Sequence, residues 1–276
     1  MSAPLVALPN KSILGTVDDT TYNALRLWAL NAFTVRNLRA RNNQASPDTK
    51  VDISCDLARL QYTSAGITYP AIAQGVDLSL DSAAVGAGGL DSGALGAHEL
   101  WHLYLIGQDA ASSGVISPVS LLASKSATSP TMPGSYTHRR RVSWAWTDAS
   151  SHFVKFHHDG AIWKFDERQT AASGSASVAR TTASLAGFVP GFCRQAFVRM
   201  QVESAWGADG VSYLYAKGAN LPTLSTVDCD YGEEGQVGSW VAVPTLEIDY
   251  EVSATGTWAW SVLVESVLAP IHSEEC

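Results

Sequence analysis

The chain has 276 residues, of which 16% are charged and 46% are hydrophobic, and its formal net charge at pH 7 is -8. This composition excludes a disordered chain, which combines low hydrophobicity with high net charge. It also disfavours nucleic acid as a direct partner, because phosphate binding needs a surplus of Lys and Arg. So few charges leave two interpretations of the surface: other chains cover much of it, or it is the neutral surface of a β-rich protein.

The N-terminal sequence MSAPLVALPNK lacks the basic region and continuous apolar stretch of a secretory signal. No segment approaches the ~20 apolar residues of a membrane span, so we expect none. The four cysteines show no C-x-x-C spacing. We therefore expect free thiols in a reducing cytoplasm and no structural zinc knuckle.

Residues 18–44 hold the clearest helical pattern. Leu25, Trp28, Leu30 and Phe33 lie close to i, i+3, i+4 spacing. Three arginines follow between residues 36 and 41, where cations would meet the negative end of a helix dipole. The pattern predicts a helical N-terminal region over residues 1–48 that offers apolar side chains for assembly.

From residue 49 onward, short apolar runs alternate with Gly, Ser, Asp and Pro clusters, which is typical of an all-β chain. The dipeptide Asp159-Gly160, after His158, predicts a hairpin turn because Asp and Gly tolerate positive φ. The first group of expected strands covers residues 51–57, 66–72, 100–106, 119–124, 142–147, 153–157 and 162–165.

Residues 167–184 are rich in Ser, Ala and Thr without periodicity, and predict a linker or an exposed connection. We expect a β domain over 49–168 and a C-terminal β-sandwich over 185–276. The predicted fold class is therefore mainly β, with sandwich or jelly-roll-like domains and a short N-terminal helical region. In the last part, Leu246, Ile248, Tyr250 and Val252 alternate with Glu247, Asp249 and Glu251, and further strands are expected over 188–202, 211–216, 238–243, 245–250 and 257–267.

The sequence HELWH at residues 98–102 matches the H-E-x-x-H signature of zinc proteases. On a helix, His98 and His102 would bind one zinc ion and Glu99 would act as general base. The surroundings favour a strand, because a glycine-rich stretch precedes the motif and residues 100–106 alternate with period two. In a strand the two histidines lie about 13 Å apart, too far for one ion.

The run His138-Arg139-Arg140-Arg141 is the basic cluster of the β region. It is either a patch for phosphate, sialic acid or a partner's carboxylates, or a strand edge with solvated or Asp-paired arginines. His157 and His158 are expected to be exposed turn residues. The chain has nine tryptophans. Exposed ones would stack on sugar rings, and Trp144 and Trp163 are the candidates beside the arginines.

No G-x-S-x-G elbow, P-loop or dinucleotide fingerprint occurs in the sequence. The paired carboxylates lie in loop-like or terminal stretches. We therefore expect no enzyme activity, no catalytic residues and no cofactor.

Four stretches, at residues 51–60, 88–108, 121–148 and 151–166, resemble a recurring domain of tailed-bacteriophage virion proteins. They read VDISCDLARL, GGLDSGALGAHELWHLYLIGQ, LLASKSATSPTMPGSYTHRRRVSWAWTD and SHFVKFHHDGAIWKFD. Their order and spacing both agree with that domain. In the domain, the segment matching HELWHLYLI is a strand, and His98 and Glu99 depart from the pattern whereas Trp101 and His102 fit it.

The resemblance implies a structural or adsorption role in a virion, in the tail, a tail fibre or a tail-associated protein, and no reaction. It implies other virion proteins as partners, a homo-oligomer with a trimer as the first expectation, and assembly in the host cytoplasm. Two alternatives stay open. One is a glycan-binding module that recognises the host surface through Trp144, Trp163 and Arg139, Arg140 and Arg141; the other is a zinc metalloprotease using His98, Glu99 and His102.

Overall fold

The computed structural model describes residues 35–64, 67–108, 116–193, 195–204, 209–219, 224–228, 234–255 and 258–268. The regular elements of the described residues are all strands. Among these residues there is no helix long and apolar enough to cross a membrane. The strands are β1 (Val35–Arg36), β2 (Arg39–Asn42), β3 (Lys50–Ser64), β4 (Ile67–Asp81), β5 (Gly89–Leu90), β6 (Leu100–Gln108), β7 (Val119–Ser124), β8 (Tyr136–Trp146), β9 (Phe156–Asp159), β10 (Ile162–Gly174), β11 (Val178–Ser184), β12 (Gln195–Ser204), β13 (Asp209–Ala216), β14 (Leu224–Asp228), β15 (Glu234–Ala242), β16 (Glu247–Thr255) and β17 (Trp258–Leu268).

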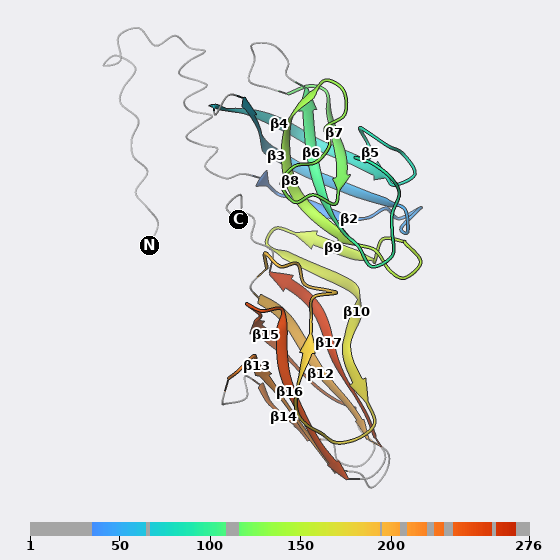
Figure 1. Ribbon diagram of the computed structural model, residues 1–276, viewed down its shortest axis with the longest axis vertical. Helices are drawn as coiled ribbons and strands as arrows, with labels where there is room; N and C mark the ends of the chain where they lie inside the picture. Colours follow the sequence, from blue (N-terminus) through green and yellow to red (C-terminus); the bar gives the residue numbers. More distant parts are fainter. Residues whose placement is uncertain are drawn as a thin grey trace, which may run out of the picture.

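Thirteen strands belong to one sheet, whose main path runs β15-β12-β17-β10-β9-β2-β3-β8-β6-β7-β5, with β1 and β4 paired to β3. The other four form a second sheet in the order β11-β16-β13-β14. All pairings are antiparallel except the short contact of β5 with β7. Figure 1 shows an elongated molecule with β2 to β9 in one part and β10 to β17 in the other. Strand β10 joins the two parts because it pairs with β9 on one side and β17 on the other.

In the first part, β3 and β8 share the single register pair Gln61 and Arg139. Strand β7 lies near β4, and the backbone N–H of Ile116, just before β7, donates to the carbonyl of Ile72 on β4. Strand β6 is buried along both faces, with a burial pattern that is continuous from its second to its eighth residue. This confirms the prediction of a buried strand over residues 100–106, and it follows from the alternation of large apolar side chains there.

In the second part, β15, β12, β17 and β10 pack against the four-stranded sheet as a β-sandwich. The rings of Tyr250 and Trp260 meet between the two sheets, with centroids 5.2 Å apart. The buried side chains between the layers include Val198, Met200, Val202, Leu214, Ile248, Val252, Val262 and Val264. The predicted fold class, mainly β with a sandwich, is confirmed.

The helical prediction for the N-terminal region is wrong where the structure describes it. Residues 1–34, with most of the predicted helix, lie outside the described residues, but Arg39–Asn42 forms β2 between β3 and β9. Ala40 is buried, whereas Arg39 and Arg41 on either side are exposed. This period-two pattern belongs to a strand, and pairing on both edges overrides the local helical preference.

The predicted linker over residues 167–184 is also wrong, because most of it lies in β10 and β11. These residues are mostly exposed, as expected, but the stretch has too few breaking residues to interrupt a strand, and Thr favours an extended backbone. The hairpin prediction is confirmed: Asp159 pairs with Ile162, and Gly160 has a φ of +59°.

Candidate functional site

The HELWH segment lies at the start of a strand. His98 has a φ of +55° in a turn, and β6 begins at Leu100. The strand prediction is confirmed, and the two histidines do not share one helical face as a zinc protease requires. Within the described part of the chain, no three His, Cys, Asp or Glu side chains converge as a metal site.

Glu99 is held in a structural role at this turn. Its carboxylate accepts hydrogen bonds from Lys125 Nζ at 2.5 Å and from the backbone N–H of Gly96 at 2.9 Å. The hydrogen bond from Lys125 lowers the pKa of Glu99 below its usual value. A carboxylate tied up in this way is a poor general base at neutral pH, so the geometry does not fit the metalloprotease alternative.

The basic run lies on β8, an interior strand between β3 and β6, so the strand-edge interpretation is wrong. Arg139 Nη2 donates to the carbonyl of Thr128 at 2.9 Å. Arg140 is buried, and its Nη1 donates to the carbonyl of Arg59 at 3.2 Å. The three guanidinium groups therefore do not form one exposed anion-binding patch.

Trp144 and Trp163 are core residues, with exposed fractions of 4% and 0%. Their rings stack with centroids 5.8 Å apart and an interplanar angle of 13°. Trp163 Nε1 donates to the carbonyl of Trp144 at 3.0 Å. Neither ring has a face open to a sugar, so the prediction that these two tryptophans bind a glycan is wrong.

The structure does bring several predicted residues together, around Phe192 of the loop that joins β11 to β12. The Phe192 ring meets Trp144 edge-to-face at 5.1 Å, and the Arg141 guanidinium lies 4.5 Å from its centroid. His102 lies 5.9 Å from the same ring. Trp146 Nε1, also on β8, donates to a carbonyl of this loop at 3.0 Å. We call this cluster, His102, Arg141, Trp144 and Phe192, the junction cluster, because it packs the loop of the second part onto the first.

A β-bulge explains how Arg141 and Trp144 reach the same ring, although three positions separate them. The register of β6 against β8 shifts between the pairs Leu103–Ser143 and Tyr104–Arg141, which leaves Val142 unpaired. An extra residue in one strand reverses the alternation beyond it. Simple period-two counting puts Arg141 on the opposite face, and no signal in the sequence marks the bulge.

Two histidines at or near the junction cluster, His102 and His158, are buried and neutral. Burial, with the charge of Arg141, lowers the pKa of His102 to about 4. Burial likewise lowers the pKa of His158 to about 4, and Ser143 Oγ lies 2.9 Å from its Nδ1. His158 was expected to be exposed; only His157, which lies 2.8 Å from Asp166, is. Both imidazoles are therefore uncharged near pH 7, and neither acts as a general acid there.

The two cysteines described, Cys55 and Cys193, are buried free thiols. Burial raises the pKa of Cys55 to about 11 and that of Cys193 to about 12. A thiol needs its thiolate form to act as a nucleophile. Neither cysteine is therefore suited to covalent catalysis at neutral pH.

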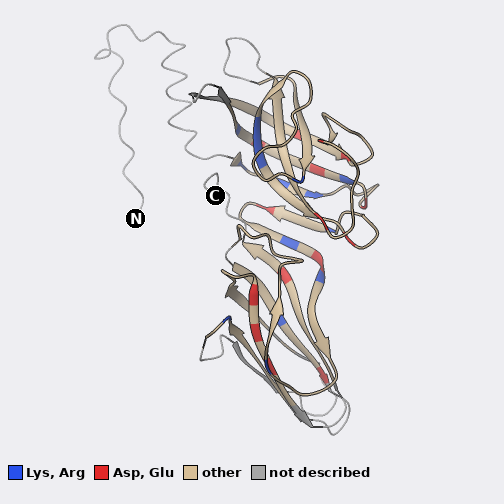
Figure 2. Cartoon of the chain, viewed as in Figure 1, with Lys and Arg blue, Asp and Glu red and all other residues tan. Residues whose placement is uncertain are grey.

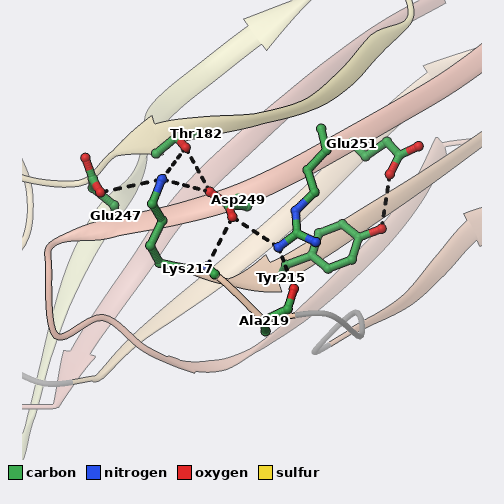
Figure 3. A network of polar contacts seen from close by, with 9 residues as sticks. Thr182, Tyr215, Lys217, Ala219, Glu247, Asp249 and Glu251 are labelled. Carbon is green, nitrogen blue, oxygen red and sulfur yellow. Dashed lines mark hydrogen bonds and ion pairs between the residues drawn. The ribbon is translucent and has the colours of Figure 1, made fainter.

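The most extensive polar network that the sequence analysis missed surrounds Asp249 on β16 (Figure 3). Its carboxylate accepts from Thr182 Oγ1 at 2.8 Å, from Arg180 Nη2 at 3.1 Å and from the N–H of Gly218 at 3.2 Å. Lys217 Nζ lies 3.2 Å from it. Burial alone would raise the pKa of Asp249, but these hydrogen bonds outweigh it and lower the pKa to about 2.

The Asp249 network is closed on itself. Arg180 also lies over the ring of Tyr215 at 4.1 Å, and Lys217 lies 3.7 Å from Glu247. Every donor aimed at the carboxylate comes from a neighbouring strand or turn, so the arrangement joins β11, β16 and the turn after β13. Its chemistry is that of a structural ion-pair network.

No protein-family model matches this chain, and no curated protein matches it. Among solved structures, the crystal structure of a Bacillus thuringiensis Cry1Da tryptic core variant aligns with a TM-score of 0.20 and 5% sequence identity. The alignment covers 86% of this chain and 53% of that one, so the chain spans about half the length of that structure. A similarity this low does not indicate a shared fold.

Proposed function

We propose that this chain is a structural component of a bacteriophage virion, in the tail, a tail fibre or a tail-associated part. The observation that carries the proposal is the set of four sequence blocks, at residues 51–60, 88–108, 121–148 and 151–166, that resembles the virion domain. The arrangement of these blocks in space supports it.

The blocks supply β3, β5 and β6, β7 and β8, and β9 with the start of β10. In the sheet these strands follow the order β10-β9-β2-β3-β8-β6-β7-β5, so β2 alone interrupts the path. Four separate stretches of sequence thus build one run of strands into which β2 alone is inserted. Of the three intervals between the blocks, the one from β6 to β7 joins neighbouring strands of this run.

The arrangement of the chemically active side chains agrees with a structural role. The buried histidines and thiols are neutral, and the carboxylates of Glu99 and Asp249 are held in ion pairs. Assembly in the host cytoplasm and incorporation into the virion as a homotrimer, in contact with other virion proteins, belong to the same proposal. The glycan-binding alternative is not proposed for Trp144 and Trp163, because both are buried.

Deletion of the gene from the phage genome tests the proposal. We expect particles with a missing or defective tail in negative-stain electron microscopy, and a titre that a plasmid copy of the intact gene restores. A copy carrying Trp163→Ala, which removes a core ring, should restore it less well. Deletion particles with normal tails and normal titre would contradict a structural role.

A further inference from the structure

Strand β15 forms one edge of the thirteen-stranded sheet. It pairs along its whole length with β12, from Glu234 opposite Glu203 to Ala242 opposite Gln195, and no other described strand pairs with it. Strand β14 lies near β15 in the other sheet, but it pairs with β13. In an antiparallel sheet, every second residue of an edge strand points its N–H and C=O groups away from the neighbouring strand. Strand β15 therefore offers backbone donors and acceptors to a further strand.

The other strands that end a sheet are short or irregular. Strand β5 has two residues. Strand β14 has five, and its register against β13 shifts once. The register of β11 against β16 shifts between Val178 and Thr181, at the position of Arg180. Short strands, bulges and charged side chains are the devices by which edges avoid pairing with other chains.

Two further strands with an open side, β4 and β10, are interrupted as well. Gly75 of β4 has a φ of +58°, and the carbonyl of Ile72 already accepts from the N–H of Ile116. Beyond its pairing with β9, β10 carries the charged run Asp166–Arg168, and its register against β17 shifts twice. Figure 2 shows charged residues of both signs along β10. None of these edges offers a long, regular and uncharged strand.

Strand β15 differs because it has none of these protections. Its nine residue pairs with β12 follow one another without a register shift. Between Gly235 and Val243 the sequence has no Asp, Glu, Lys, Arg or Pro. A long, flat, uncharged edge of this kind is a site at which another strand adds to the sheet. The contrast with the other edges indicates that β15 is left open for pairing.

The outward side chains beside this edge are apolar and already ordered. Trp240 is 37% exposed, and its ring meets that of Phe197 edge-to-face with centroids 5.7 Å apart. Phe197 rests on Gly238, where an added Cβ would lie 2.8 Å from Cε1 of the ring. A side chain that is already ordered loses little conformational entropy when a partner covers it.

The charged groups nearest to these rings compensate one another. Arg199, opposite Gly238 on β12, donates from Nε and Nη2 to Glu265 at 2.5 and 3.2 Å. This pairing lowers the pKa of Glu265, although burial alone would raise it. The edge around Trp240 therefore carries no excess of one sign that would repel an identical edge.

We propose that β15 is a self-association edge, at which the β15 strands of two copies of this chain pair antiparallel about a twofold axis near Trp240. Two identical strands satisfy each other in this arrangement, because each contact occurs twice. The Trp240 rings of the two copies lie opposite each other, and aromatic cross-strand pairs stabilise a sheet. A twofold contact is compatible with the proposed trimer, since the two axes combine in D3 symmetry.

The extent of the contact sets the expected affinity. One pair of strands with one ring from each side buries less than the about 800 Å² per partner of a standard interface, so we expect association in the micromolar range. The contact consists of backbone hydrogen bonds and apolar side chains, without ion pairs between the copies. Salt should therefore leave the association unchanged.

Sedimentation velocity of the full chain between about 1 and 100 μM tests the pairing. We expect the mass to rise with concentration from 29.3 kDa towards twice that value, equally in 0.1 and 0.5 M NaCl. Trp240→Lys and Ala242→Lys each put a charge on the exposed edge and should weaken association more than tenfold. Thr181→Lys, on the exposed edge strand β11, is the matched control and should associate like the wild type. Urea unfolding of each variant checks that it is folded.

Hydrogen exchange measured by mass spectrometry at the same two concentrations locates the contact. The peptide covering Gln236–Ala242 should exchange more slowly at 100 μM than at 1 μM, because outward N–H groups of β15 become hydrogen-bonded in the dimer. Three results would overturn the inference: a wild-type chain that stays monomeric at 100 μM, lysine variants of β15 that associate like the wild type, or a dimer whose β15 peptide exchanges equally at both concentrations. The inference concerns the purified chain, so each of these results leaves the deletion test of the virion role unaffected.

Discussion

Acid should destabilise this protein through two buried histidines before its carboxylates respond. His102 and His158 both have a pKa near 4 in the folded chain, against about 6.5 when unfolded. Below pH 6.5 the unfolded chain therefore binds more protons than the folded chain, and the free energy of unfolding falls as the pH falls. At pH 5 each histidine accounts for a loss of about 2 kcal/mol, or about 4 kcal/mol together.

The loss is large beside the 5–15 kcal/mol that is typical of a folded domain. Urea unfolding at pH 7.5 and pH 5 measures it directly. The ion-paired Asp249 does not contribute to the difference in stability between pH 7.5 and pH 5. Its pKa is lowered from 3.8 to about 2 in the folded chain, so the stability it supplies is lost only as the pH falls from 3.8 towards 2. In the variants His102→Gln and His158→Gln the difference between the two pH values should shrink by about 2 kcal/mol each.

His157→Gln is the matched control, because His157 precedes His158 on β9 but is exposed on the opposite face of the strand. This variant should keep the wild-type difference in the free energy of unfolding between pH 7.5 and pH 5. A wild-type chain with equal stability at pH 7.5 and pH 5, or the same difference in the His102 variant, would refute the burial of these neutral imidazoles.

Three further predictions follow from the packing, each measured as a change in the free energy of urea unfolding at pH 7.5. Trp163→Ala removes a fully buried ring and should cost about 3–5 kcal/mol, whereas Trp240→Ala, which removes a partly exposed ring packed on Phe197, should cost about 1 kcal/mol; equal costs would contradict their assigned burial. Asp249→Ala leaves two half-buried cations without their carboxylate and should cost about 1–3 kcal/mol; no loss would show that the network is solvated. Gly107→Ala puts a Cβ 2.0 Å from Ile116 Cγ2 and should cost about 1–3 kcal/mol, and an unchanged stability would contradict that close approach.

Local patterns were sufficient for much of the fold. The alternation over residues 100–106 predicts β6 in spite of the HELWH motif, and Asp159-Gly160 predicts the turn between β9 and β10. Both features depend on a few consecutive residues, whose backbone preferences act without help from the rest of the chain.

The remainder depends on contacts between distant residues. Arg39–Asn42 looks helical in sequence and becomes a strand because β3 and β9 pair with both of its edges. The alternation along β16 predicts that its acids lie opposite its apolar residues. It does not predict that Asp249 is buried, which depends on Arg180, 69 positions away, reaching its carboxylate. Sequence spacing carries no record of such a partner.

The candidate site was the least predictable part. Composition marks Trp144 and Trp163 as notable residues, but their exposure depends on Phe192 and Phe156, which come from other strands and loops to cover them. The bulge at Val142 turns Arg141 toward that cover. The exposed tryptophan of the described part, Trp240, has no sequence feature that separates it from the buried ones.

Mass spectrometry of gradient-purified phage particles tests the virion role most directly. The account predicts peptides of this chain in the fractions that contain infectious particles, at a constant ratio to the major tail proteins and in multiples of three copies per particle. Peptides found only in the soluble fraction of the lysate, and absent from the particles, would contradict it.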